Sequence, residues 1–343
     1  MKKFLFAAIA AFSLTACLDE PTPPQPRDYE GTLVNTDITE DVTWYSDSIY
    51  TIQGRVSVES GVSLTIQPGC IIKGRQGAGS MASALVIARG GKIYAEGTPG
   101  APIIFTSELD QIQPGQLASP NLDENANGLW GGLIVLGKAP ISAATSPLQI
   151  EGIPSSDHTG LYGGTDSLDN SGIIRYVSIR HGGTNIGSGN EINGLTLGGV
   201  GKGTTIENIE VIANQDDGIE FFGGNVNVTN ALVWNQGDDA FDVDQSWGGI
   251  LDNFVSIDGL DHALELDGAE GTMIDSFTLI NGTLLGQDTA QCHFRDAAQG
   301  YISITGAYNI EADAGTNVVV DSNPTGADLS VFNWTVTYSK GKL

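Results

Sequence analysis

Three related stretches decide the fold: Asn214-Gln-Asp-Asp-Gly-Ile-Glu, then Asn235-Gln-Gly-Asp-Asp-Ala-Phe-Asp, then Gly259-Leu-Asp-His-Ala-Leu-Glu. They align without gaps at their acidic positions, and equivalent residues lie 22 or 23 apart along the chain. The columns of equivalent residues are Asn208, Asn230 and Asn253; Asp216, Asp238 and Asp261; Asp217, Asp239 and His262; and Glu220, Asp242 and Glu265. A fixed period of this length indicates a repeat architecture.

Each repeat contains short alternating apolar stretches separated by Gly, Asn and Asp, which is typical of strands joined by turns. Helical spacing is absent from the pattern, and the leucine and asparagine consensus of leucine-rich repeats is missing. A period of 22 to 23 therefore predicts the coils of a parallel β-helix, stacked about 4.8 Å apart. We predict an all-β protein in which residues 32–343 form one right-handed parallel β-helix, a single solenoid with loop insertions.

Alternation along each strand also predicts which side chains point into the coil. The expected inward residues are Ile219, Phe221, Phe241, Val243, Leu264 and Leu266. Glu220, Asp242 and Glu265 then point outward, with Asp244 and Asp267 on the same face. Residues 205–271 contain fifteen Asp or Glu and no Lys or Arg. Neighbouring carboxylates on such a column repel by roughly 1 to 3 kcal/mol per pair, so the column needs a cation, raised pKa values or a function.

The start of the chain has the pattern of a processing signal. Lys2 and Lys3 precede an apolar run over residues 4–14, and Leu-Thr-Ala-Cys ends at Cys17. This resembles a bacterial lipoprotein signal peptide, and the resemblance implies cleavage after residues 1–16 and lipid attachment to Cys17. Leu18 after the cysteine implies, by the same resemblance, an outer-membrane destination. An ordinary secretory signal with a chance cysteine is the alternative.

Residues 17–31 are rich in proline, and we expect them to form a tether between the lipid and the β-helix. No other apolar run approaches the ~20 residues that cross a bilayer, so the lipid is the expected membrane attachment. The formal charge of −26 becomes −28 once residues 1–16 are removed. A protein this acidic should not bind nucleic acid, and it should meet a polyuronate only through divalent cations. A glycan or a surface protein remains a candidate partner.

Two further stretches carry a family resemblance. Val62-Ser-Leu-Thr-Ile-Gln-Pro-Gly resembles the opening coils of β-helical bacterial surface proteins, and Trp130-Gly-Gly-Leu-Ile-Val-Leu-Gly resembles a signature of β-helical outer-membrane lipoproteins. The resemblance implies a pectin-lyase-like right-handed parallel β-helix and a membrane-attached location. It implies little about chemistry.

Residues 108–128 and 142–170 interrupt the coil pattern, and we interpret both as loops that leave the solenoid. In the first loop, Asp123, Asn125 and Asn127 match the opening half of a calcium-binding loop. Position twelve of that motif is Ile134 rather than Glu. An ordinary Asn-Gly turn is therefore the favoured interpretation, and a calcium loop the alternative.

Several smaller predictions follow the same logic. Arg175, Arg180 and His181 should form salt bridges with acids on the next coil. The Asn column should be a ladder of stacked turn amides, continued by Ser276. Cys70 and Cys292 are too far apart along a solenoid to pair and should be buried apolar side chains. Residues 331–338 alternate like a strand and are expected to close the last coil.

The acidic repeats also resemble polygalacturonase-type glycosidases in the order of their polar residues. That resemblance would make Asp238 or Asp239 the general acid, Asp217 and its neighbour the base that activates water, His262 a support and Arg295 a substrate contact. His262 is not flanked by glycines, and no Ile-Lys follows Arg295, so this chain departs from the pattern. A lyase base, Lys or Arg, is likewise absent from residues 205–271.

The leading functional hypothesis is a lipid-anchored binding or structural module whose acidic face binds calcium. The expected ligands are Asp217, Glu220, Asp239, Asp242, Asp244, Glu265 and Asp267. Oxygen-only donors favour calcium or magnesium over zinc. A purely structural protein with solvated acids and a polygalacturonase-like inverting hydrolase are the two alternatives.

Overall fold

The computed structural model describes residues 31–186, 192–286 and 289–343. Gly31–Leu343 form one compact unit. The expected signal peptide (residues 1–16), Cys17 and the tether up to residue 30 lie outside the described residues. Within these residues, no helix is long and apolar enough to cross a membrane.

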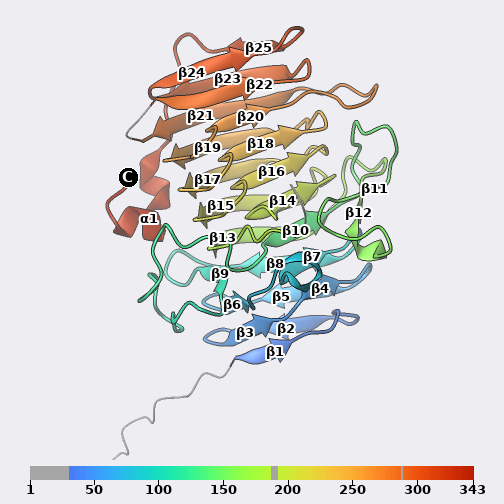
Figure 1. Ribbon diagram of the computed structural model, residues 1–343, viewed down its shortest axis with the longest axis vertical. Coiled ribbons are helices and arrows are strands. Elements are labelled where there is room, and N and C mark those ends of the chain that lie inside the picture. Colours follow the sequence, from blue (N-terminus) through green and yellow to red (C-terminus); the bar gives the residue numbers. More distant parts are fainter. Residues whose placement is uncertain (1–30, 187–191, 287–288) are drawn as a thin grey trace, which may run out of the picture. The chain divides into compact units, whose positions relative to one another are not determined.

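The unit is a right-handed parallel β-helix with almost no helix, as the sequence predicts (Figure 1). The main path of its larger sheet runs β1 (Thr32–Val34), β3 (Ile49–Ile52), β6 (Ile71–Gly74), β9 (Ile103–Ser107), β13 (Gly172–Arg180), β15 (Thr205–Ile212), β17 (Val228–Trp234), β19 (Ile250–Ile257), β21 (Phe277–Leu285), β23 (Gln299–Thr305) and β25 (Asn317–Val320). A side branch of the same sheet runs β2 (Val42–Trp44), β5 (Ser63–Ile66) and β8 (Lys92–Glu96), and it joins β13. From β13 onward, one long strand per coil therefore spans two faces of the solenoid.

The second sheet forms the remaining face and carries the acidic positions. Its order is β4 (Arg55–Val58), β7 (Ala84–Ile87), β10 (Leu133–Leu136), β14 (Leu195–Gly198), β16 (Ile219–Phe222), β18 (Phe241–Asp244), β20 (Leu264–Leu266), β22 (Ala290–Phe294) and β24 (Tyr308–Ala312). Ile219 is in register with Phe241, and Phe241 with Leu264. These pairs confirm the predicted steps of 22 and 23 residues.

Stacked apolar side chains fill the interior of the solenoid. The six predicted inward residues are all at most 1% exposed and belong to one continuous core. Cys70 and Cys292 are buried and unpaired, as predicted. Each coil thus buries its apolar alternation against the coils above and below, which is the main stabilisation available to a solenoid.

The Asn column marks the corner where each long strand turns from one face to the next. Asn208, Asn230 and Asn253 adopt φ of 58°, 58° and 59°, a left-handed conformation that Asn tolerates well. Their side chains form the predicted ladder, with Nδ2 to Oδ1 distances of 3.1 Å from Asn230 to Asn208 and 2.7 Å from Asn253 to Asn230. Asn281, not Ser276, continues the column. The prediction was wrong because Ile250 pairs with Thr278, so this coil is longer than the preceding repeats.

Both predicted insertions leave the solenoid and fold back onto its outer faces. Ile112 of the first packs against Ile49, Ile71 and Ile104. The second contains the hairpin of β11 (Leu148–Gln149) and β12 (Leu161–Tyr162) and the short helix η2 (His158–Gly160), and it packs on the outer face of β7, β10 and β16. Another short helix, η1 (Gly79–Met81), precedes β7.

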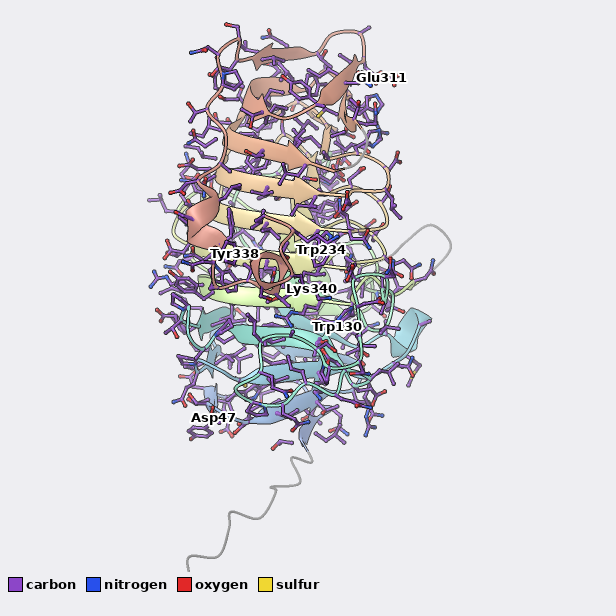
Figure 2. The ribbon with its side chains drawn as sticks, turned by 90° about the vertical axis from the view of Figure 1, so that its left-hand side faces the viewer. Asp47, Trp130, Trp234, Glu311, Tyr338 and Lys340 are labelled. Atoms are coloured by element: carbon purple, nitrogen blue, oxygen red, sulfur yellow. The ribbon has the colours of Figure 1, made fainter. Side chains whose placement is uncertain are left out.

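The C-terminal segment corrects the prediction of a last strand at residues 331–338. It forms the short helices η3 (Leu329–Phe332) and α1 (Val336–Ser339), whereas β24 and β25 form the last coil. The outer face of β17 and β19 is apolar, and Phe332 and Val336 cover it. Figure 2 shows this segment, with Lys340 near Trp234; the Lys340 ammonium lies 5.6 Å from the ring centroid.

Two predicted arginine salt bridges are present. Arg175 pairs with Glu207 on the next coil, and Arg180 with Glu210 at 3.7 Å. The Arg180 and Glu210 side chains are 2% and 0% exposed, and Glu210 also accepts hydrogen bonds from the Thr337 amide and hydroxyl. This buried pair therefore links the solenoid to its C-terminal segment. His181 differs from the prediction, because its Nδ1 lies 2.6 Å from the Ala126 carbonyl oxygen instead.

Replacing Phe241 by Ala should lower the free energy of unfolding by about 3 to 5 kcal/mol, because the cavity lies between two stacked coils. Leu260→Ala is the control: Leu260 is 72% exposed, and its loss should cost at most about 0.5 kcal/mol. Urea denaturation of the two variants checks this, and equal effects would contradict the assignment of Phe241 to the core.

Candidate functional site

The acidic column lies on the outer face of the second sheet. Glu220 and Asp242 are partners in the register of β16 and β18, and Asp242 and Glu265 in that of β18 and β20. The turns before these strands carry a second column of acidic residues. Each of these carboxylates accepts a hydrogen bond from a backbone amide of the next coil. Asp217 Oδ1 accepts from the Asp239 amide at 2.9 Å, and Asp239 Oδ1 from the His262 amide at 2.8 Å. These backbone hydrogen bonds fix the positions of the Asp217 and Asp239 carboxylates relative to the neighbouring coil.

The carboxylates are much less exposed than an outward column of solvated acids would be. Asp217, Glu220, Asp239 and Glu265 are 7%, 5%, 3% and 9% exposed. Residues of the neighbouring coils shield these side chains from solvent, and the second insertion also lies against this face. Ser142, at its start, donates its amide hydrogen to the Gln245 carbonyl and accepts one from the Glu270 amide. The column is therefore partly covered by other residues, and most of its carboxylates have little contact with solvent.

Burial is the first cause of the raised pKa values in this column, and mutual repulsion the second. The pKa values of Asp217, Glu220 and Asp242 lie well above their usual range because burial penalises the ions and nearby carboxylates repel them. Glu151 of the second insertion adds to this effect at Glu220. Burial raises the pKa of Asp239 to about 8. At neutral pH Asp239 therefore holds a proton unless a cation replaces it, and the raised pKa values of Asp217, Glu220 and Asp242 favour their protonated forms in the same way.

Asp244 and Asp267 extend the column toward the end of each strand. Burial raises their pKa values to about 6 and about 7, and the two side chains share a hydrogen bond. Arg295 lies beside them, with its Nε 3.7 Å from Asp267 Oδ1, and its Nη1 also contacts Glu265. Arginine therefore neutralises this end of the column.

The centre of the column, formed by Asp217, Glu220 and Asp242, has no basic side chain as a salt-bridge partner among the described residues. Oxygen atoms of Asp217, Glu220 and Asp242 lie within 4.8 Å of one another. In the described part of the chain, the nearby basic side chains pair with Asp239, Glu265 and Asp267 instead. Asn193 donates its side-chain amide to Glu220. The buried Oδ1 atoms of Asn193 and Asp242 have no hydrogen-bond partner, so the site contains oxygen donors that the protein itself leaves unsatisfied.

Asn193 is a site residue that the sequence interpretation missed. Leu195 is in register with Ile219, so Asn193 occupies the same position as Asp217 one coil earlier. The period could have found it, because it lies 24 residues before Asp217. Glu151 could not have been found that way, since it belongs to an insertion outside the repeats.

The residues of the glycosidase hypothesis are only partly brought together. Asp217, Asp238 and Asp216 group within 4.8 Å, and His262 Nδ1 lies 2.9 Å from Asp239 Oδ1. Inverting hydrolysis needs carboxyl groups about 6.5 to 9.5 Å apart to leave room for a water molecule, whereas facing oxygens of Asp216, Asp217 and Asp238 lie within 4.8 Å of one another. Arg295 pairs with Glu265 and Asp267 rather than pointing to a free subsite. The arrangement is better suited to holding a cation than to inverting hydrolysis.

Asp123, Asn125 and Asn127 lie in the first insertion. Asp123 Oδ1 accepts from the Asn125 amide at 3.0 Å, and its carbonyl accepts from the Ala126 amide at 3.2 Å. Gly128 follows with φ of 65°. This geometry is that of an Asx turn closed by glycine, and it supports the ordinary turn over the calcium loop.

Comparison with protein families agrees with the architecture. A family model described as a pectate-lyase like β-helix domain matches residues 36–336. No curated protein matches the chain. Among solved structures, the crystal structure of Dettilon tailspike protein matches with 14% sequence identity, 87% of this chain covered and a TM-score of 0.28. The match covers 61% of the tailspike chain.

Raised pKa values in the column predict that the cation-free protein loses stability with rising pH. The folded state keeps protons on Asp239 and Asp267 that the unfolded chain has already released, so unfolding is favoured as pH rises. Buried His181, with a pKa lowered to about 4, is neutral in the folded state, and the unfolded chain releases this proton by pH ~7.5, so the histidine opposes the trend only weakly and only below that pH.

Between pH ~6.5 and ~8.5 we expect the free energy of unfolding to fall by about 3 kcal/mol in chelator-treated protein. Urea denaturation at several pH values measures it, and Asp239→Asn should make the profile shallower, because one of the contributing carboxyl groups is removed. A profile that is flat or rising in the unmodified chain would contradict the raised pKa values.

Proposed function

The chain belongs to the pectate-lyase-like β-helix family, and on this scaffold we propose a lipid-anchored binding module whose buried carboxylates hold a divalent cation. Asp217, Glu220 and Asp242 are the central ligands in this proposal. The single observation that carries it is their geometry: the three carboxylates have oxygens within 4.8 Å of one another, Asp217 and Glu220 are buried and Asp242 is half-buried, and none has a salt-bridge partner among the described residues.

Calcium is the cation that this donor set favours. All the available donors are oxygens, which suit hard cations such as calcium or magnesium. The buried Oδ1 of Asn193 belongs to the same site, and its amide can turn to present that oxygen. Calcium accepts six to eight oxygens in irregular arrangements and takes water for the remainder. Magnesium demands a near-ideal octahedron, which a column fixed by coil spacing does not favour.

The bound cation would serve the module in two ways. It would neutralise three carboxylates that otherwise repel one another and so stabilise the central coils. It would also lie near Asp216 and Asp238, which group with Asp217, and the acidic patch continues from Asp238 to the exposed Asp261. Calcium held at such an edge can bridge to the carboxylates of a polyuronate or of a surface protein, which the acidic chain would otherwise repel.

Lipid anchoring is part of the same proposal and rests on the sequence before residue 31. The charged start, the apolar run and Cys17 support an attachment to the outer membrane, with residues 18–31 as a spacer. An anchored module that holds calcium beneath an acidic surface patch would act as a local adhesive or structural element rather than as a diffusing enzyme.

Inverting hydrolysis of a polysaccharide is the second candidate, and one observation favours it. The pKa of Asp239 is raised to about 8 by burial, and a general acid at neutral pH needs such a proton. Cleavage of polygalacturonate that disappears in Asp239→Asn while the protein stays folded would favour this candidate over the binding module.

Calcium at about 100 times its dissociation constant should stabilise the folded chain by about 2.7 kcal/mol, visible as a higher thermal midpoint. Glu220→Gln combined with Asp242→Asn should abolish that gain. The same double variant should be more stable than the unmodified chain without calcium at pH ~8, because the two amides neither repel each other as ions nor take up a proton on folding.

The matched control is Glu40→Gln with Glu311→Gln, which removes the same charge from two exposed positions. Glu311 lies near the end of the solenoid, as Figure 2 shows, and is in register with His293 on the neighbouring strand. This control should keep the full calcium response. A midpoint unchanged by calcium in the unmodified chain would leave the acids as protonated or solvated structural groups and contradict the proposal.

Cys17→Ala should prevent lipid attachment. Expressed in a bacterium with labelled fatty acid, the unmodified chain should carry label and fractionate with the outer membrane, whereas the variant should be unlabelled and either unprocessed or released. Labelling of the variant, or membrane fractionation unchanged from the unmodified chain, would contradict the lipid anchor.

A further inference from the structure

One histidine in the acidic column lies close to three carboxylate oxygens but can donate a hydrogen bond from the facing nitrogen to only one of them at a time. His262 Nδ1 lies 2.9 Å from Asp239 Oδ1, 3.4 Å from Glu265 Oε2 and 3.8 Å from Asp261 Oδ1. A ring nitrogen carries at most one hydrogen, so it can donate to only one of these oxygens at a time. Asp239 Oδ1 already accepts the His262 backbone amide hydrogen at 2.8 Å. A hydrogen bond to Asp239 accounts for the shortest of these contacts, but it leaves Glu265 Oε2 close to the same nitrogen with no hydrogen to accept from it.

The distances also match those between the ligands of a small metal ion. Zinc binds His nitrogen and carboxylate oxygen at about 2.0 to 2.2 Å, so two such ligands of a tetrahedral site lie about 3.3 Å apart. The contacts of His262 Nδ1 with Asp239 and Glu265, at 2.9 and 3.4 Å, bracket that separation. One donor atom from each of the three residues falls within a 4.8 Å group.

The surroundings hold these side chains in place. Arg295 contacts the other oxygen of Glu265, which fixes the orientation of that carboxylate. The Asp239 and Glu265 side chains are 5% and 12% exposed, whereas His262 is 21% exposed, so the histidine side of the group faces solvent. The His293 ring lies 5.5 Å from the His262 ring, and its buried Nε2 has no hydrogen-bond partner.

We propose that Asp239, His262 and Glu265 form a second metal site, which takes a divalent transition metal of the zinc class. The imidazole separates it chemically from the oxygen-only group of Asp217, Glu220 and Asp242, and the two groups share no ligand. Nitrogen donors favour zinc, cobalt or nickel over calcium. Three protein ligands leave a fourth coordination position, which water or a ligand group from a partner can occupy. The site does not depend on calcium binding.

Zinc titration by calorimetry, on the full chain after chelator treatment and in saturating calcium, tests the proposal. We expect one zinc ion per chain to bind despite the calcium. His262→Gln should weaken zinc binding by at least about 10- to 100-fold. His158→Gln is the matched control, because His158 also lies near a carboxylate, 3.5 Å from Glu59, but its side chain is 78% exposed. It should leave the zinc affinity unchanged.

Cobalt(II) absorption and the ring nitrogen signals of His262 in NMR provide a second measurement, made on the unmodified chain. A four-coordinate cobalt spectrum and a shift of the Nδ1 resonance on zinc addition are expected. Absence of zinc binding, binding that calcium displaces, or an unchanged affinity in His262→Gln would each overturn the site. Zinc binding without any calcium response would instead contradict only the proposed function, and a calcium response without zinc binding only the inference made here.

Discussion

Parallel stacking of coils about 4.8 Å apart is the constraint on which the rest of this structure depends. It places every side chain directly above its equivalent in the neighbouring coil, so a residue type that repeats becomes a column. Apolar columns build the core, and the column of Asn208, Asn230 and Asn253 satisfies its own amides. The same geometry brings Glu220 and Asp242 together, although their charges oppose it. The coil stacking that stabilises the core and the Asn column therefore brings like charges together in the acidic column.

The outer faces of the solenoid are covered or neutralised in different ways, depending on whether their residues are apolar or acidic. Where outward residues are apolar, a segment outside the repeats covers them, as the first insertion covers Ile71 and the C-terminal helices cover Trp234. Where outward residues are acidic, an arginine neutralises one end of the column, and His262 contacts its carboxylates farther along. The centre has neither arginine nor histidine among the described residues. A cation from solution is the component that would complete it.

Much of this could be predicted from the sequence, because local alternation and a fixed period determine both core and register. The inward residues, the steps between coils and the acidic column follow from those two patterns. The period failed where the chain departs from it: the longer coil before β21 shifted the Asn column from Ser276 to Asn281. Residues 331–338 alternate like a strand, yet they cover an apolar face that only the assembled coils create. Burial of the column was likewise not predictable, since neighbouring coils and an insertion produce it.

The central claim is that buried carboxylates at Asp217, Glu220 and Asp242 exchange protons for a divalent cation. Counting the protons released when calcium binds tests it most directly. Calorimetry at pH ~7 in buffers of different ionisation enthalpy gives that number, because released protons are taken up by the buffer. The account predicts net proton release that declines as pH rises, since the raised pKa values of these groups favour their protonated forms over the ions that bind calcium. Calcium binding without proton release, or no binding, would contradict it.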